Sequence, residues 1–275
     1  MTALLPSARV RSDHVITAPA TVPLKIRLDP QANNTDAEQA CIEKARRAHS
    51  KHPMFIGIGG GRGAGKEHTC RNVIDRVRER GYIELAGRVV HLHLDDFHRE
   101  LSPEDRGLID DGKMVINFDH PESYDFGRLA SVLQSLRNGE SVDVPEWDSK
   151  LFRHTGAVRH IDCRPRVVLV EGTLVLFANE VRQFMDIQVF VDVDSDTRLS
   201  RQLNARLRDE NPGSDKERTN LLVHGFLDVY LQMGKPCFEE FVWPTKRWAD
   251  VIIPKGDRNN VATELIAQRL IDLDA

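Results

Sequence analysis

The sequence lacks the features that hold many secreted and membrane proteins together. It has four cysteines, which are far apart and form no C-x-x-C pair: Cys41, Cys70, Cys163 and Cys237. Such spacing gives neither a disulfide framework nor a zinc knuckle, so it predicts a reduced, intracellular protein of the cytoplasm. The most apolar stretch, residues 167–178, is interrupted by Glu171 and Gly172 and is too short to span a bilayer. We therefore expect no transmembrane helix and no membrane partner.

An excess of charge of either sign is also missing. The 38 lysines and arginines nearly balance the 42 aspartates and glutamates, which gives a formal net charge of -4. Because the basic residues are scattered among acidic ones, no basic stripe is expected to bind a nucleic acid. Hydrophobic residues make up 40% of the 275 residues, which is enough for a full core in one principal domain.

The first fifty residues differ from the rest of the chain. Helical periodicity is weak there, and turn-forming residues interrupt the pattern at Pro6, Pro19, Pro23, Pro30, Asn33 and Asn34. The composition predicts a poorly ordered leader over residues 1–50 and one folded domain over residues 51–275. Arg9 and Arg11, with few acids around them, leave an organellar presequence open as an alternative.

From residue 54 onward short apolar runs alternate with helical patterns. Strands are expected at residues 54–58, 89–94, 167–170, 187–191 and 251–253. Apolar residues recur at helical spacing over 70–77, 126–136 and 261–270, and Gly81 and Gly139 are placed to end the first two of these helices. The alternation predicts an α/β fold with a mainly parallel sheet flanked by helices.

A glycine-rich loop separates the first expected strand from the first expected helix. It reads Gly60-Gly61-Arg62-Gly63-Ala64-Gly65-Lys66 and fits the first seven positions of the phosphate-binding pattern G-x-x-x-x-G-K-[ST]. Glycines let backbone N–H groups turn toward phosphate oxygens, and the lysine can reach the β and γ phosphates of ATP. We therefore predict a nucleotide site over residues 60–68, which ends with Glu67 and His68. A glycine-rich turn that binds nothing is the alternative.

The eighth position of this pattern departs from expectation. A serine or threonine hydroxyl would bind Mg²⁺ there, whereas this chain has Glu67. Its carboxylate could bind Mg²⁺, could repel the triphosphate, or could point away along the helix while a water takes the metal position. Glu67 is thus a candidate metal ligand, and a site without catalysis is the alternative.

Several further segments match one known family in the same order. They are residues 57–66, 95–97, 117–121, 170–172, 190–192, 196–201, 235–236, 238–241 and 249–254. With these motifs the chain from Phe55 onward resembles the uridine/cytidine kinases of the phosphoribulokinase and uridine kinase group. The resemblance implies a P-loop NTPase fold with a small lid at about residues 203–220. It also implies ATP and Mg²⁺, a homo-oligomer, and a pyrimidine nucleoside as the small molecule whose 5'-hydroxyl is phosphorylated.

The resemblance assigns roles to residues near the phosphates. Asp95 takes the position of the base that orients the acceptor hydroxyl, although the neighbouring Asp96 is open to confusion with it. Glu171 takes the position of a Mg²⁺ ligand, with helix capping as the alternative. In the lid, Arg206 and Arg208 are the candidates for a cation that, with Lys66, neutralises the transferred phosphate.

The acceptor pocket mixes residues that match the family with residues that depart from it. Asp119 takes the position of an aspartate that binds ribose hydroxyls, unless it caps the following turn, and Trp147 that of an aromatic ring against the base. His98 replaces a tyrosine, Phe152 falls near a base-reading histidine, and Gln202 stands where an arginine is expected. These departures leave two alternatives: another hydroxylated small molecule as the acceptor, and a nucleotide-binding relative without catalysis.

Two histidines precede the proposed base. His91, His93 and Asp95 alternate along the second expected strand and would share one face. This spacing also suits a transition-metal site, for which packed or hydrogen-bonded histidines are the alternative.

Overall fold

The computed structural model describes residues 52–111, 113–162, 164–256 and 260–274. The leader predicted over residues 1–50, with Arg9 and Arg11, lies outside these residues, as do Cys41 and Cys163. Cys70 and Cys237 lie within them, and both are buried and free. In the part of the chain that the structure describes, no helix is long and apolar enough to cross a membrane.

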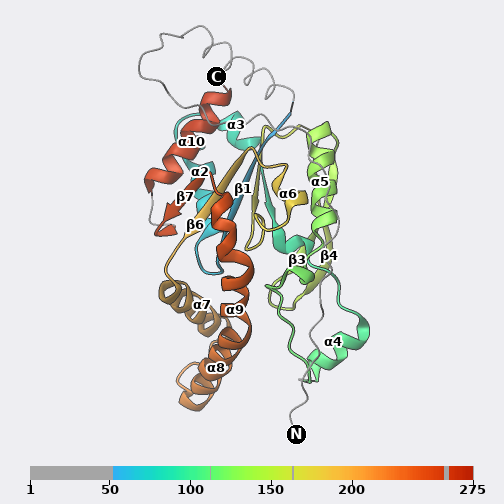
Figure 1. Ribbon diagram of the computed structural model, residues 1–275, viewed down its shortest axis with the longest axis vertical. Coiled ribbons are helices and arrows are strands. Elements are labelled where there is room, and N and C mark those ends of the chain that lie inside the picture. The colour runs from blue at the N-terminus through green and yellow to red at the C-terminus, as the bar shows by residue number, and fades with distance from the viewer. Residues whose placement is uncertain (1–51, 112, 163, 257–259, 275) are drawn as a thin grey trace. The chain divides into compact units, whose positions relative to one another are not determined.

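Five parallel strands form the main sheet (Figure 1). In the order β2-β5-β1-β6-β7 they are Val89–His93, Val167–Glu171, Met54–Gly60, Ile187–Asp192 and Val251–Pro254. Every neighbouring pair is parallel. β1 and β5 are buried along their whole length, which explains why their sequences are continuous apolar runs. The five predicted strands and the parallel sheet are confirmed.

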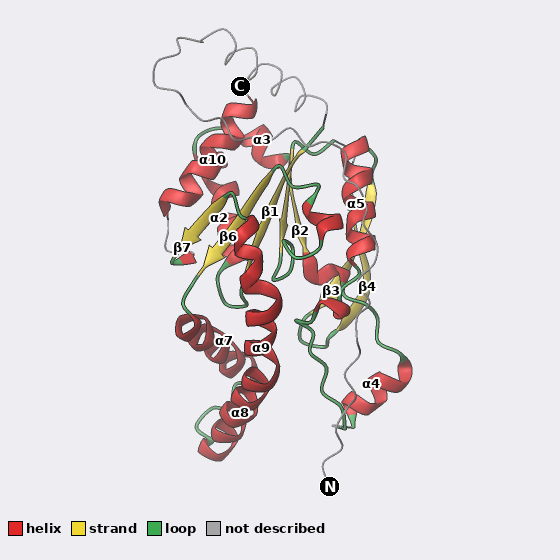
Figure 2. Cartoon of the chain, viewed as in Figure 1, coloured by secondary structure: helices red, strands yellow, loops and turns green. Residues whose placement is uncertain are grey.

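Helices cover both faces of this sheet (Figure 2). The residues of α2 (Lys66–Glu79), α3 (Ile83–Gly87) and α10 (Asn260–Asp274) share one core with the sheet, and those of α5 (Phe126–Asn138) and α6 (Asn179–Arg182) share the other. The three predicted helices correspond to α2, α5 and α10. α5 ends, as predicted, at Gly139, whose φ of 79° is left-handed and therefore suits glycine.

Alternate residues of β1 point into these two cores. Ile56 and Ile58 belong to the core beneath α2 and α10, whereas Phe55 belongs to the core beneath α5. All three side chains are fully buried. The strand is thereby fixed on both faces, and so is the starting point of the glycine-rich loop that follows it.

Two elements near the carboxyl ends of the strands differ from the prediction. The second strand ends at His93, and residues 94–97 form the short 3-10 helix η1 (Leu94–Phe97), so that Asp95 lies in a turn rather than at a strand end. An antiparallel hairpin of β3 (Val142–Asp148) and β4 (Arg153–Ile161) was not predicted. Most residues of β4 are exposed, and the apolar pattern that would mark such a strand is therefore weak.

The remaining helices are α4 (Pro103–Asp110), η2 (Pro121–Ser123), α7 (Ser195–Glu210) and α8 (Lys216–Val229). After α8 the chain stays helical through η3 (Tyr230–Gly234), α9 (Lys235–Cys237), η4 (Phe238–Val242) and η5 (Trp243–Trp248). The lid predicted at residues 203–220 spans the end of α7, the connecting loop and the start of α8. In Figure 1 this helix pair lies below the carboxyl ends of the strands.

Gly172, which follows β5, lets η1 approach the sheet closely. A Cβ at this position would overlap the Cβ of Leu94, a fully buried residue of η1. Because a Cβ moves only with its backbone, no side-chain rotation could relieve this overlap. The absence of a side chain at Gly172 therefore lets Leu94, the first residue of η1, pack directly against the chain next to Glu171.

Gly172→Ala is expected to lower the free energy of unfolding by about 1–3 kcal/mol, because the added methyl group overpacks this contact. Urea-induced unfolding measures the loss. Gly225→Ala is the matched control: Gly225 lies in α8 with open space at its Cβ position, so this variant should be more stable by up to about 1 kcal/mol. Equal losses in the two variants would contradict the close approach of η1 to β5.

Candidate functional site

The glycine-rich loop joins β1 to α2, and its carbonyl oxygens are held by side chains. Lys66 Nζ donates to Gly61 O (3.3 Å), Arg201 Nη1 to Gly63 O (3.2 Å) and Gln202 Nε2 to Arg62 O (3.1 Å). No side chain among the described residues caps the N-terminus of α2, so its first N–H groups remain available to an anion. The loop and the helix start together have the geometry of a phosphate site.

α7 packs so closely on this loop that it excludes side chains there. A Cβ at Gly63 would lie 2.7 Å from the carbonyl O of Arg198, and one at Gly61 would overlap the Arg198 guanidinium. Arg198 is 4% exposed and stacks 3.8 Å above the ring of Phe238. Sequence reasoning gave no role to Arg198 or Arg201, although both lie in the matched segment 196–201. The motif was visible, but the contacts of its side chains were not.

Glu67 and His68 lie exposed in the first turn of α2. The Glu67 carboxylate forms an ion pair with Arg71, one turn along the helix, and its side chain is 51% exposed. Thr69, the nearest hydroxyl, is buried and donates to Gly65 O (3.0 Å). Of the three possibilities for Glu67, the geometry favours a carboxylate that points along the helix.

The adjacent residues Asp95 and Asp96 point in different directions. Asp95 Oδ1 accepts a hydrogen bond from the Tyr124 hydroxyl (3.3 Å), and its side chain is 42% exposed. Asp96 is largely buried: its Oδ1 accepts from Trp147 N (3.3 Å), and its Oδ2 lies 3.7 Å from Arg159 Nη2. Burial raises the pKa of Asp96. Asp96 therefore braces the hairpin, whereas Asp95 is open to a ligand.

Beside Asp95 lies a set of aromatic side chains that we call the ring cluster: His98, Phe118, Tyr124, Trp147, Phe152 and His154. The His98 ring lies 4.1 Å from that of Tyr124 and 4.6 Å from that of Trp147. Phe152 stacks on Phe118 at 4.6 Å. Trp147 lies on β3 and His154 on β4, so the unpredicted hairpin supplies part of this cluster.

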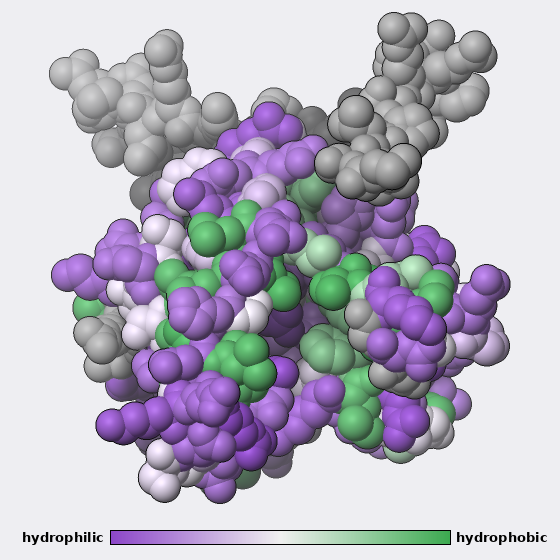
Figure 3. Space-filling view, turned by 90° about the horizontal axis from the view of Figure 1, so that it is seen from below, coloured by the Kyte–Doolittle hydropathy of each residue, from purple (hydrophilic) through white to green (hydrophobic). Residues whose placement is uncertain are grey.

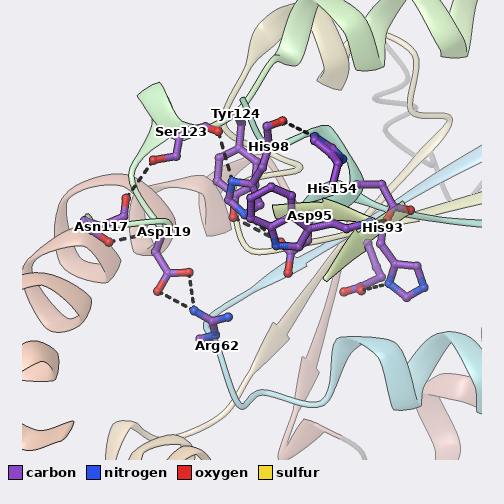
Figure 4. A network of polar contacts seen from close by, with 12 residues as sticks. Arg62, His93, Asp95, His98, Asn117, Asp119, Ser123, Tyr124 and His154 are labelled. Carbon is purple, nitrogen blue, oxygen red and sulfur yellow. Dashed lines mark hydrogen bonds and ion pairs between the residues drawn. The ribbon is translucent and has the colours of Figure 1, made fainter. Parts of the chain in front are cut away.

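The two histidines of the ring cluster are held by backbone carbonyls. His98 Nδ1 lies 3.1 Å from Ser123 O, and His154 Nε2 lies 2.9 Å from His98 O (Figure 4). Burial lowers the pKa of His98, which favours the neutral ring. His154 Nδ1 is buried and finds no partner among the described residues. Sequence reasoning chose Phe152 near the position of a base-reading histidine and missed His154, which lies only two residues further on.

Asp119 faces the glycine-rich loop (Figure 4). Its two carboxylate oxygens lie 3.3 and 3.5 Å from Arg62 Nη1, and its backbone N–H donates to Asn117 Oδ1 (3.1 Å). Asp119 and Asp95 both raise the pKa of Arg62. The start of η2 is capped by His120 instead, so the alternative of a turn-capping Asp119 is not what the structure shows. The ion pair joins the loop to the residue matched to ribose binding.

The cavity at this ion pair is lined in part by Arg62, Asp119, Thr173 and Gln202. Figure 3, which views the molecule toward the carboxyl ends of the strands, shows the surface hollowed between two hydrophilic lobes. Gln202 lines the cavity, but its side-chain amide is bound to the loop at Arg62 O. To contact an acceptor, as predicted, the Gln202 amide would have to give up its hydrogen bond to Arg62 O.

Among the described residues, Arg206 and Arg208 form no hydrogen bond or ion pair with the glycine-rich loop, and the phosphate role predicted for them stays a prediction. Arg206 forms an ion pair with Glu210 (2.8 Å), and Arg208 lines a second cavity together with Arg201, residues 211–213 of the loop after α7, and Thr219 of α8. α7 continues as a regular helix, so these arginines lie about 7–10 Å beyond Arg201 along its axis. The cations that the structure places at the loop are Arg62, Lys66, Arg198 and Arg201.

Glu171 ends β5 beside the two histidines of β2. Its Oε1 lies 2.8 Å from His93 Nδ1, and its side chain is 11% exposed. The His91 and His93 rings are 4.1 Å apart. The metal ligands considered for this strand were His91, His93 and Asp95, but Asp95 lies beyond the strand and contacts Tyr124. Glu171 takes its place because β2 and β5 pair in register at His93 and Glu171.

Comparison with known proteins gives an independent finding. A model of the Phosphoribulokinase / Uridine kinase family matches residues 55–262. Uridine-cytidine kinase B of Dictyostelium discoideum is 35% identical over 232 residues, which cover 83% of this chain and 86% of that protein. Uridine-cytidine kinase 2-B of Danio rerio is 35% identical over 241 residues, which cover 86% of this chain and 87% of that protein.

A solved structure bears on the fold alone. The phosphoribulokinase from Rhodobacter spheroides aligns with a TM-score of 0.51 at 15% identity, over 74% of this chain and 70% of that chain. The likeness agrees with the parallel sheet and its flanking helices. The predicted fold class is confirmed.

Proposed function

The chain belongs to the phosphoribulokinase/uridine kinase family, and we propose that it transfers the terminal phosphate of ATP to the 5'-hydroxyl of a pyrimidine nucleoside. The observation that carries this proposal is the ion pair between Arg62 and Asp119. It brings a residue of the phosphate-binding loop into contact with the residue matched to ribose binding. A donor site and an acceptor site therefore share a boundary, as phosphate transfer between two bound molecules requires.

On the donor side, the loop N–H groups and the start of α2 bind phosphate oxygens. Lys66 stabilises negative charge on the β and γ phosphates. Arg62, rather than Arg206 or Arg208, supplies the guanidinium nearest to the boundary between the two sites. From this position it stabilises charge on the phosphate during transfer.

Glu171 is the carboxylate that fits a Mg²⁺ ion at this site. It is largely buried at the carboxyl end of β5, and Mg²⁺ is held in such sites by one or two carboxylates together with phosphate oxygens and waters. When bound, the ion neutralises charge on the β and γ phosphates. This arrangement needs no contribution from Glu67, whose carboxylate is bound to Arg71.

On the acceptor side, Asp95 accepts a hydrogen bond from the 5'-hydroxyl and orients its oxygen toward the γ phosphorus. The Tyr124 hydroxyl, which donates to Asp95 Oδ1, fixes this carboxylate. Asp119 accepts hydrogen bonds from the ribose hydroxyls. Trp147 stacks on the base, and the unpaired Nδ1 of His154 is the group that meets a polar edge of the base.

The homo-oligomer, the cytoplasmic location and the absence of a nucleic-acid partner stay predictions. The acceptor is a small molecule, as the nucleoside kinases among the relatives indicate.

With ATP and Mg²⁺, the purified protein should form ADP when uridine or cytidine is present and much less when no nucleoside is added. Lys66→Ala should lower this turnover at least about 100-fold, because one charge-stabilising group is lost while the core is untouched. A coupled ADP assay with mass spectrometry of the product measures both, and thermal unfolding controls for folding. Turnover only with another hydroxylated metabolite would show that the acceptor is not a nucleoside. Tight ATP binding without turnover on any acceptor would refute the proposed kinase activity.

Asp95→Asn should lower kcat by about 10²–10⁴-fold and leave the KM for ATP nearly unchanged, because the amide keeps the size of the side chain but is a poor acceptor for the hydroxyl proton. Asp96→Asn is the matched control, since it makes the same change at the neighbour that faces the hairpin. Steady-state kinetics on both variants separate the two residues. A larger loss of kcat in Asp96→Asn would show that the base has been assigned to the wrong neighbour.

Glu67→Ala and Glu67→Ser should change turnover and its Mg²⁺ dependence by less than about fivefold, because an exposed pair between residues one turn apart contributes at most about 1 kcal/mol. Arg71→Ala, which removes the other partner, should have an equally small effect. Turnover measured against Mg²⁺ concentration for all three variants tests this. A large gain in both Glu67 variants would instead indicate that the native carboxylate keeps Mg²⁺ out, and a gain in Glu67→Ser alone would indicate that the new hydroxyl binds the ion.

A further inference from the structure

Two histidines and a glutamate converge on the α2 side of the sheet, next to the phosphate-binding loop. His91 and His93 alternate along β2 and so share one face, and β5 brings Glu171 opposite His93. One ring nitrogen of each histidine and one oxygen of Glu171 all lie within 4.8 Å of one another. Among the described residues, no other group of three possible metal ligands lies so close together.

The state of the two rings suits a metal ion. The Nε2 of His91 is buried and has no hydrogen-bond partner among the described residues, which costs free energy as long as nothing binds it. A neutral imidazole has a lone pair that can bind a metal ion, and the Nε2 of His91 is placed to offer it. The Nδ1 of His93 is held at 2.8 Å from Glu171 Oε1, which fixes the second ring beside the carboxylate.

We propose that His91, His93 and Glu171 bind a transition-metal ion of the zinc class. Two imidazoles and one carboxylate, with a fourth position left open, form a donor set that zinc prefers. Magnesium, in contrast, prefers oxygen ligands and keeps several waters. The site is therefore selective by the chemistry of its ligands, and it can fill without nucleotide because all three ligands come from the protein.

The charges around the site do not oppose this binding strongly. Arg159, on β4, is a cation close to His91: its Nη1 donates to His91 O (2.9 Å), and its Nη2 lies 3.7 Å from Asp96. Asp96 and Glu67 act on His93 as negative charges, together with Glu171. The two arginines that act on His91, Arg159 and Arg71, each lie beside a carboxylate, Asp96 and Glu67, which offsets their positive charge.

The site shares Glu171 with the Mg²⁺ position of the proposed function. A zinc-class ion that occupies His91, His93 and Glu171 takes this carboxylate away from Mg²⁺, so turnover should fall when the site is filled. This consequence rests on the proposed function, whereas metal binding itself does not. The two can therefore be tested apart.

Titration of the untagged, nucleotide-free protein with Co²⁺, followed by visible absorption, tests the binding. One equivalent should bind with the strong d–d absorption of a low-coordinate ion with nitrogen ligands. His91→Leu should weaken this binding at least about tenfold, as removal of a ligand does. His160→Leu is the matched control, because His160 is exposed beside Asp143 on the outer part of the hairpin, and it should bind Co²⁺ as the wild type does.

Absence of the band in the wild type, or a band of equal strength in His91→Leu, would overturn the site. If His91→Leu does not fold, His91→Asn removes the ring with a smaller change in polarity and serves the same comparison. Zn²⁺ added to a Mg²⁺-dependent assay should inhibit the wild type more strongly than His91→Leu, and equal inhibition would overturn the link through Glu171. Co²⁺ binding in a protein without kinase turnover would leave the site standing and refute only the proposed function.

Discussion

Hydrogen bonds to the carbonyl oxygens of the glycine-rich loop are the constraint on which the site depends. A loop of this kind can bind phosphate only if its N–H groups face the ligand, and that requires its oxygens to find partners elsewhere. Lys66, Arg201 and Gln202 provide these partners, and Gly63 allows α7 to come near enough for the contacts to form. The helix that leads into the predicted lid is thus also the support of the loop.

At the carboxyl edge of the sheet, the adjacent residues Asp95 and Asp96 make different contacts. Because η1 turns the chain directly after β2, Asp95 faces the open side with Tyr124, and Asp96 faces the hairpin with Trp147 N. Gly172, directly after β5, lets this turn pack against the chain next to Glu171. A strand that simply continued would also have pointed the two side chains to opposite faces. The contacts of Asp96 with Trp147 and Arg159 on the hairpin fix its direction here.

The parts of the fold that the sequence could predict are those in which burial leaves a clear pattern. β1 and β5 are apolar throughout because both of their faces are covered, and the glycine-rich loop carries a motif with its own physical meaning. The hairpin could not be predicted because β4 is mostly exposed and carries no clear apolar pattern. His154 was missed for the same reason, since its position opposite Trp147 depends on how the chain turns between Asp148 and Arg153. The matched segment ends at Arg201, and the regular helix α7 carries Arg206 and Arg208 further along its axis, a displacement that proximity in sequence does not reveal. Glu67 could not be placed from the sequence because its partner, Arg71, competes with a metal for the same carboxylate.

In the absence of substrates, Arg62 and Asp119 bind each other. In the proposed function, each side chain occupies the place that a substrate group would take: the guanidinium stands in for the ribose hydroxyls on Asp119, and the carboxylate stands in for the phosphate on Arg62. A phosphate that draws Arg62 toward the loop frees Asp119 for hydroxyl donors, and a diol on Asp119 frees Arg62 for phosphate. Since such coupling between two sites is reciprocal, either substrate favours the binding of the other, by up to about fivefold for a partly exposed pair worth about 1 kcal/mol. Cooperation between the two substrates can therefore arise from one exchanged contact, without any movement of the sheet.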